Sequence, residues 1–239
     1  MGVLMFKPSL KTWPYHYFRP LWWAVLVLAL LPAIILVLGY INKNLGINAL
    51  ETLERDTGRW AVILLILTLF ITPGRRIMLR LFRRLGWRWG KRLPDWNFMI
   101  HMRRMLGLVC FFYGVAHTWV YLEFDLSWNW SAFLDDWNEK PYIVAGVLNL
   151  ALLTLLAVTA HDEMMRMLKR NWRRIHRLIY LIALLSIAHW WWMSKPGDLR
   201  AIPYITVLLA LLAYRLLTWF DWMLLKDHDD GMPVVPRDG

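Results

Sequence analysis

The chain has 239 residues, of which 59% are apolar, and its 28 Lys and Arg against 17 Asp and Glu give a net charge of +11. This composition excludes a disordered chain and argues against an ordinary soluble domain, since soluble domains are typically about 45–50% apolar. In a membrane protein the basic surplus first sets orientation, so it does not indicate nucleic-acid binding. The single cysteine, Cys110, excludes an intrachain disulfide and a metal site built from cysteines alone.

Six apolar segments reach or approach the roughly 20 residues that a membrane helix needs. None has Asp or Glu in its central turns. We therefore predict an all-α integral membrane protein, a six-helix transmembrane bundle surrounded by lipid. The first segment is interpreted as a retained helix, because it lacks the small-residue cleavage site of a signal peptide. In chain order, the predicted spans are 21–41, 60–77, 105–122, 142–160, 175–193 and 202–225.

Basic residues are concentrated in alternate loops. The loop at 75–104 contains ten Lys and Arg and the loop at 161–177 contains six, whereas the loops at 42–58 and 123–141 are poor in basic residues and acidic instead. The positive-inside rule then places both termini and these two loops in the cytoplasm. The predicted parts are a cytoplasmic N-terminal segment at 1–20, a transmembrane domain at 21–225, and a short cytoplasmic tail at 226–239, expected to be disordered.

Histidines are the candidates for chemistry inside the membrane, because intramembrane ionisable residues are rare and usually functional. The third and fifth spans both run outward, and His117 and His189 each lie near the outer end of one of them. Two histidines at one depth on different helices suit axial ligation of a haem iron by neutral imidazoles. The alternative is that each only hydrogen-bonds a neighbouring helix. Four other histidines are interpreted as solvated or interfacial, namely His16, His101, His161 and His228.

His176 begins the fifth span, thirteen residues before His189, which is about 20 Å along a helix. That rise suits a second haem, but on an ideal helix the two side chains point about 140° apart. At the matching depth the third span has Arg103 and Arg104 rather than a histidine. One haem is therefore predicted, and a second would need a kink or bulge near His176. Alternatively, His176 and the neighbouring arginines bind haem propionates or a flavin phosphate.

Small and aromatic residues accompany the predicted haem site. Gly107 and Gly114 share one helix face, which opens space for a neighbouring helix or for a flat macrocycle. Tryptophans crowd the outer ends of the third and fifth spans, and an interfacial aromatic belt explains most of them. Neither feature decides between a structural and a functional role.

Several short motifs, each weak alone, follow one another in a fixed order between about residues 57 and 219. They are Gly58-Arg59, Thr72-Pro73, Arg103-Arg104-Met105-Leu106-Gly107-Leu108, Ala116-His117, Tyr121, Lys140-Pro141-Tyr142-Ile143, Trp172, Ile175-His176-Arg177-Leu178, Tyr180 and His189-Trp190-Trp191-Trp192. In order and spacing the chain resembles the MsrQ (YedZ) family of the ferric reductase-like transmembrane superfamily.

The resemblance implies an electron-transfer subunit of the bacterial inner membrane. Electrons would come from the quinone pool or a cytosolic flavin reductase, pass through haem b and FMN, and leave to MsrP, a periplasmic molybdopterin-containing reductase. The repair of methionine sulfoxide in oxidised periplasmic proteins is then expected on MsrP, with no catalytic residue in this chain. The family's haem ligands correspond to His117 and His189, with His176 as a third cofactor-binding residue.

Two other classes of function stay open. A stand-alone transmembrane ferric or quinone reductase would use the same haem site and pass electrons to a small acceptor. A non-redox small membrane protein would be colourless, and it is disfavoured because the sequence has no inverted repeat or broken helix pair typical of transporters.

Overall fold

The computed structural model describes residues 18–86 and 93–229, and side chains from 18–86 and 95–220. No described residue lies in a β-strand. In chain order the elements are α1 (Phe18–Ile41), α2 (Ala49–Arg84), η2 (Leu93–Trp96), α3 (Phe98–Val120), η3 (Tyr121–Asp125), α4 (Trp130–Glu139), α5 (Pro141–Thr159), α6 (Asp162–Leu168), α7 (Arg170–Ile175), η4 (His176–Leu178), α8 (Ile179–Met193) and α9 (Ile202–Asp229).

The protein is a multi-pass helical membrane protein, as the composition predicts. The described residues contain five helical segments long and apolar enough to cross a membrane: Phe18–Ile41, Ala49–Arg84, Phe98–Asp125, Pro141–Thr159 and Ile202–Phe220. The segment predicted at 175–193 is divided instead, since α8 itself has 15 residues. However, α7, η4 and α8 follow one another without a gap, so the total of six spans stays a prediction.

The predicted terminal segments are only partly described. α1 already includes residues 18–20, and α9 continues through residues 226–229. Residues 1–17 and 230–239, which make up the rest of the predicted N-terminal segment and tail, lie outside the described residues. The cytoplasmic location of both ends therefore remains a prediction.

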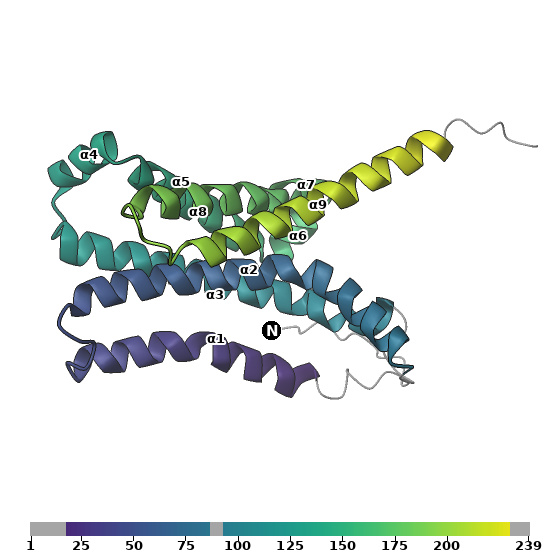
Figure 1. Ribbon diagram of the computed structural model, residues 1–239, viewed down its shortest axis with the longest axis horizontal. Coiled ribbons are helices and arrows are strands. Elements are labelled where there is room, and N and C mark those ends of the chain that lie inside the picture. Colours follow the sequence, from purple (N-terminus) through teal and green to yellow (C-terminus); the bar gives the residue numbers. More distant parts are fainter. Residues whose placement is uncertain (1–17, 87–92, 230–239) are drawn as a thin grey trace, which may run out of the picture.

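Two antiparallel helix pairs form the centre of the bundle. α2 packs along α3, and α5 packs along α8, while α9 crosses α2 and α1 lies beside α3 (Figure 1). The interior is filled by side chains such as Leu64, Tyr113 and Ile182, which are almost completely buried. The helix α4 stands at one end of the bundle, and α6 and α7 stand at the other. We call these the α4 end and the α7 end.

Local chemistry sets where the helices of the α4 end begin. The side chain of Asn48 accepts a hydrogen bond from the backbone N–H of Glu51 and so caps α2. α5 has Pro141 in its first turn, where a missing N–H leaves no helical hydrogen bond unmade. These residues fix where α2 and α5 begin, and the first turns of both helices pack against the candidate site.

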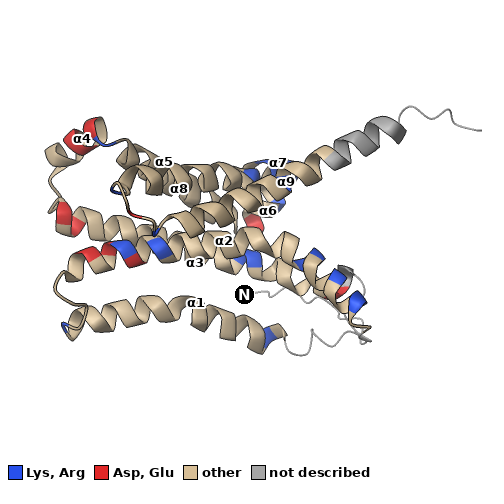
Figure 2. Cartoon of the chain, in the orientation of Figure 1, with Lys and Arg blue, Asp and Glu red and all other residues tan. Residues whose placement is uncertain are grey.

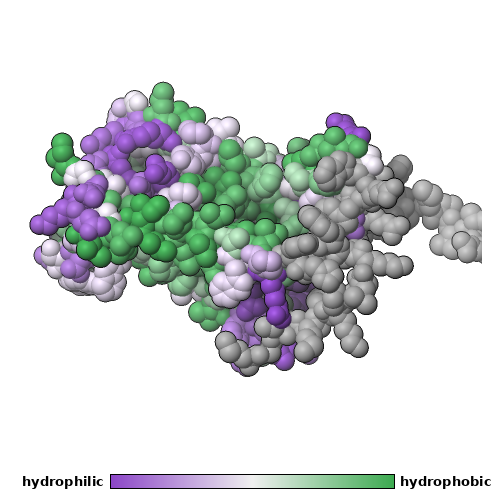
Figure 3. Space-filling model, turned by 90° about the horizontal axis from the view of Figure 1, so that it is seen from below, coloured by the Kyte–Doolittle hydropathy of each residue, from purple (hydrophilic) through white to green (hydrophobic). Residues whose placement is uncertain are grey.

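Charge and hydropathy are distributed as a membrane-spanning bundle requires. Basic residues gather at the α7 end, while most acidic residues lie at the α4 end, on α4 and at the start of α2 among other places, with some basic residues among them (Figure 2). Apolar residues cover much of the surface between (Figure 3). Large apolar side chains face outward there, with Leu28 64% and Val158 59% exposed. Such a surface is stable in lipid rather than in water.

A tyrosine hydroxyl is inserted into the backbone of α1. Tyr113 on α3 accepts a hydrogen bond from the N–H of Ala33 at 2.9 Å and donates one to the carbonyl of Ala29 at 3.0 Å. These two backbone groups pair with each other in an uninterrupted helix. The insertion lies next to Pro32, which has no N–H to offer the helix. Tyr113 thus holds α1 against α3 at the point where the backbone hydrogen bonding of α1 is interrupted.

We expect Tyr113→Phe to reduce the free energy of unfolding by about 1–2 kcal/mol, because both hydrogen bonds to α1 disappear. Thermal unfolding of the purified protein in detergent measures the change. Tyr40→Phe is the matched control, since Tyr40 is exposed and lies beside Phe124. Equal melting temperatures for the two variants would show that the insertion contributes no stability.

Candidate functional site

His117 lies near the C-terminal end of α3, against the first turns of α2. Its Nδ1 is 2.9 Å from the backbone carbonyl oxygen of Glu54. A Cβ atom on Gly58 would lie 3.1 Å from the ring Cε1 of His117 and 3.2 Å from Nδ1, so the ring packs on the glycine. Because a carbonyl oxygen only accepts, Nδ1 is the nitrogen that carries the proton.

His189 lies near the C-terminal end of α8 and repeats this arrangement against α5. Its Nδ1 is 2.7 Å from the carbonyl oxygen of Tyr142. A Cβ atom on Gly146 would lie 3.0 Å from Cε1 and 3.1 Å from Nδ1 of the ring. The proton is again on Nδ1, which fixes the same neutral tautomer in both histidines.

The structure brings the two predicted histidines together. The ring centres of His117 and His189 are 6.1 Å apart, and their planes are at 88° to each other. With both Nδ1 atoms engaged, neither Nε2 forms a hydrogen bond to a described residue, so each keeps its lone pair for a metal. Two imidazoles that share a metal ion, each with a nitrogen about 2 Å away, have ring centres about 6 Å apart. The spacing of the pair is therefore one in which the two imidazoles would hold a haem iron between them.

A carboxylate joins the two halves of the site at the α4 end. Asp136 on α4 accepts a hydrogen bond from the hydroxyl of Tyr121 at 2.8 Å and forms an ion pair with Lys140 at 2.6 Å. The hydrogen bond to Asp136 raises the pKa of the Lys140 ammonium, which therefore stays charged. Tyr121 follows His117 by one turn, and Lys140 immediately precedes α5. The two interactions of Asp136 thus fix the spacing between α3, which carries His117, and α5, against which His189 packs.

His176 lies at the α7 end, at the other end of the helical run that carries His189. Its Nε2 is 3.2 Å from Oγ1 of Thr159, and its ring centre is 4.2 Å from that of Trp172. The indole N–H of Trp172 donates to the carbonyl of Thr159 at 2.9 Å. The turn η4 interrupts the α-helix at His176, which is where a second haem would need a kink or bulge. The structure does not bring His176 together with His117 and His189.

Two partly buried arginines accompany His176 at the α7 end. Arg103 on α3 donates to Oγ1 of Thr72 on α2 at 2.6 Å, and the guanidinium of Arg215 lies 5.8 Å from the ring centre of Tyr180. The Nε atoms of both arginines are buried and have no hydrogen-bond partner among the described residues. Neither arginine pairs with a carboxylate in that part of the chain. Buried cations without a counter-ion favour binding of an anionic group.

Sequence reasoning missed Arg215 and Gly146. Arg215 stands inside a predicted apolar span, and a charge in such a position is a signal of function that the sequence does offer. Gly146 gives no such signal, because a glycine in an apolar helix is common. Of the two glycines singled out, Gly114 lies against Leu153 and Leu150 of α5, so it serves the neighbouring helix, while Gly107 has open space.

The other histidines lie away from the site or outside the described side chains. His101 is exposed in the first turn of α3, and His161 caps the start of α6. The positions of these two agree with the interfacial interpretation. The side chains of His16 and His228 are not among the described residues.

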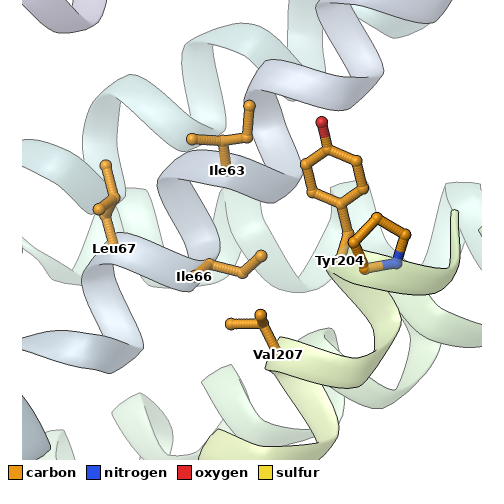
Figure 4. Close-up of a pocket in the computed structure, with 6 residues that line it drawn as sticks. Ile63, Ile66, Leu67, Tyr204 and Val207 are labelled. Carbon is orange, nitrogen blue, oxygen red and sulfur yellow. The ribbon is translucent and has the colours of Figure 1, made fainter. Parts of the chain in front are cut away.

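One further hollow lies between α2 and α9 and is open to the surface. Its volume is about 410 Å³, and it is lined by apolar side chains and the ring of one tyrosine (Figure 4). Those residues are Ile63, Ile66, Leu67, Pro203, Tyr204 and Val207. No charged side chain lines it, so it offers no ligand set comparable to the histidine pair.

The comparison with known families agrees with a helical membrane protein. Residues 57–187 match the family described as ferric reductase like transmembrane component. The matched range covers more than half of the chain and includes His117 and His176, and it ends two residues before His189. The protein is thus a ferric reductase-like transmembrane protein.

Curated relatives narrow the class. The chain is 37% identical to the protein-methionine-sulfoxide reductase heme-binding subunit MsrQ of Xanthomonas campestris pv. campestris, over 82% of this chain and 83% of the relative. It is 36% identical to MsrQ of Herminiimonas arsenicoxydans, over 79% and 81%, and 35% identical to that of Ralstonia nicotianae, over 83% and 85%. The chain belongs to the MsrQ family.

Proposed function

We propose that this chain binds haem b between His117 and His189 and carries electrons across the bacterial inner membrane to a periplasmic methionine sulfoxide reductase, MsrP. The observation that carries the proposal is the pair of imidazoles 6.1 Å apart, each with Nδ1 bonded to a backbone carbonyl. Haem iron, when bound, supplies reversible one-electron chemistry. Ligation of the iron by both His117 and His189 would favour electron transfer over oxygen activation.

The proposed topology has six spans, with both termini in the cytoplasm. The continuous helical run from Arg170 to Met193 has 24 residues, which is long enough to cross a bilayer. The basic loops at 75–104 and 161–177 then face the cytoplasm. This orientation puts the histidine pair near the periplasmic face, close to the proposed acceptor.

The α7 end is proposed as the entry for electrons. Arg103, Arg215 and His176 are partly buried, and the two guanidiniums lack a carboxylate partner among the described residues. We assign them to the phosphate of FMN, because clustered arginine suits a phosphate. Trp172 offers a flat apolar surface beside His176. The donor would be a quinone or a cytosolic flavin reductase.

Spectra and reoxidation kinetics test the proposal. Purified full-length protein in lipid nanodiscs is reduced with dithionite, freed of excess reductant, and mixed with methionine sulfoxide in the presence or absence of purified MsrP. We expect a b-type reduced-minus-oxidised spectrum that disappears rapidly only when MsrP is present. Equal reoxidation by ferric citrate or a soluble quinone without MsrP would instead indicate a stand-alone reductase. A colourless protein that takes up no haem would overturn the proposal.

A further inference from the structure

The same three-part unit occurs twice at the α4 end of the bundle. In each case a histidine from one helix meets two groups on the helix that backs it, a carbonyl and a glycine four residues later. The units are Glu54, Gly58 and His117, and Tyr142, Gly146 and His189. The two units come from different helix pairs with no detectable sequence repeat between them. A chance packing contact does not explain the repetition.

The helix geometry explains why the fourth residue is glycine. A helical carbonyl points along the axis toward the N–H of the residue four positions later, and its oxygen has a second lone pair. A side chain that donates to this oxygen must approach beside that later residue. A Cβ atom there would lie 3.0–3.2 Å from the imidazole ring atoms of His117 or His189. Only glycine lets the ring approach without displacement.

We propose that Gly58 and Gly146 are positioning residues that fix the orientation, tautomer and donor strength of the two haem ligands. The inference rests on the proposed haem site but adds to it, because it assigns residues that do not touch the iron. A hydrogen bond from Nδ1–H to a carbonyl makes Nε2 a stronger ligand and holds the ring plane. The stronger ligand stabilises ferric iron more than ferrous iron and so lowers the reduction potential.

The test compares Gly58→Ala and Gly146→Ala with the control Gly114→Ala. A Cβ atom on Gly114 would lie 3.5 Å from Leu153, an ordinary contact, on the helix that carries His117. We expect each of the first two variants to weaken ferric haem binding about tenfold or more. A tenfold weakening of ferric relative to ferrous binding corresponds to a rise in potential of about 59 mV. The low-spin ferric electron paramagnetic resonance signal should also shift, and Gly114→Ala should match the wild type.

A double-variant cycle separates positioning from general packing. If each glycine acts by making room for the imidazole ring, the decrease in melting temperature caused by Gly58→Ala should vanish in a His117→Ala background. The decrease caused by Gly146→Ala should likewise vanish in a His189→Ala background. This comparison of melting temperatures between backgrounds remains valid even where the single alanine variant is unstable. A loss that persists without the ring, or single variants with wild-type spectra and potential, would overturn the inference. A wild-type protein without a bis-histidine haem would instead overturn the proposed function.

Discussion

Replacing His117 or His189 with alanine is expected to abolish the low-spin b-type haem spectrum and to stop electron delivery to MsrP. In the described part of the chain, each histidine brings one imidazole to the site, and the two ring centres are 6.1 Å apart. With one imidazole left, the iron would be high-spin or the haem would be lost during purification. Pyridine haemochrome assay and electron paramagnetic resonance measure the haem content and the spin state.

His101→Ala is the matched control for this prediction. It removes an imidazole from the same helix, α3, but at the α7 end, where the side chain is exposed. It should leave the spectrum, haem content and electron transfer unchanged. A low-spin spectrum that survives in both His117→Ala and His189→Ala would show that the iron is ligated elsewhere, and the assignment of the site would fall.

The sequence predicts depth along a helix better than it predicts rotation or partners. His117 and His189 meet in the structure because the 1.5 Å rise per residue converts a position in the sequence into a depth in the membrane. Orientation of each span follows from charge, so depths on different helices can be compared. The meeting of the two rings was therefore predictable, although the assignment of haem to them stays a prediction.

The partners of these residues depend on which helices pack together, and a single sequence contains little of that information. The role of Gly146 can be recognised only when the structure shows that the ring of His189 on α8 packs against it. Asp136 looks like one of several acids in a loop until Tyr121 and Lys140 converge on it. The insertion of the Tyr113 hydroxyl into α1 likewise needs the packing of two helices that are 80 residues apart.

The fifth predicted span, 175–193, is divided near its start by the turn η4. Residues 170–177 are rich in arginine, and the chain forms the short helix α7 and the turn η4 there before α8 begins at Ile179. The break changes the rotation between His176 and His189, which an ideal helix sets at about 140°. Hence an experiment on the α7 end should test His176 and Arg103 as members of one site, and should not treat His176 as a haem ligand like His117 or His189.

We expect Arg103→Gln and His176→Ala to remove FMN from the protein while leaving the b-type haem in place. Arg103 is a partly buried cation whose Nε has no hydrogen-bond partner among the described residues, and the same is true of its neighbour Arg215. Removing one partner of a desolvated charge pair costs about 2 kcal/mol or more, which is roughly a 30-fold loss of affinity. Fluorescence titration of the purified protein with FMN measures this loss, and the haem spectrum measures the integrity of the α4 end.

Arg80→Gln provides the control, since Arg80 is an exposed cation in the last part of α2, so the variant loses the same formal charge. If the α7 end attracts the phosphate only through its general positive potential, Arg80→Gln and Arg103→Gln should weaken FMN binding alike, and added salt should screen both. If the partly buried arginine binds the phosphate directly, only Arg103→Gln should have a large effect, and salt should change it little. A loss of haem in Arg103→Gln, with FMN binding intact, would mean that this end binds haem propionates instead.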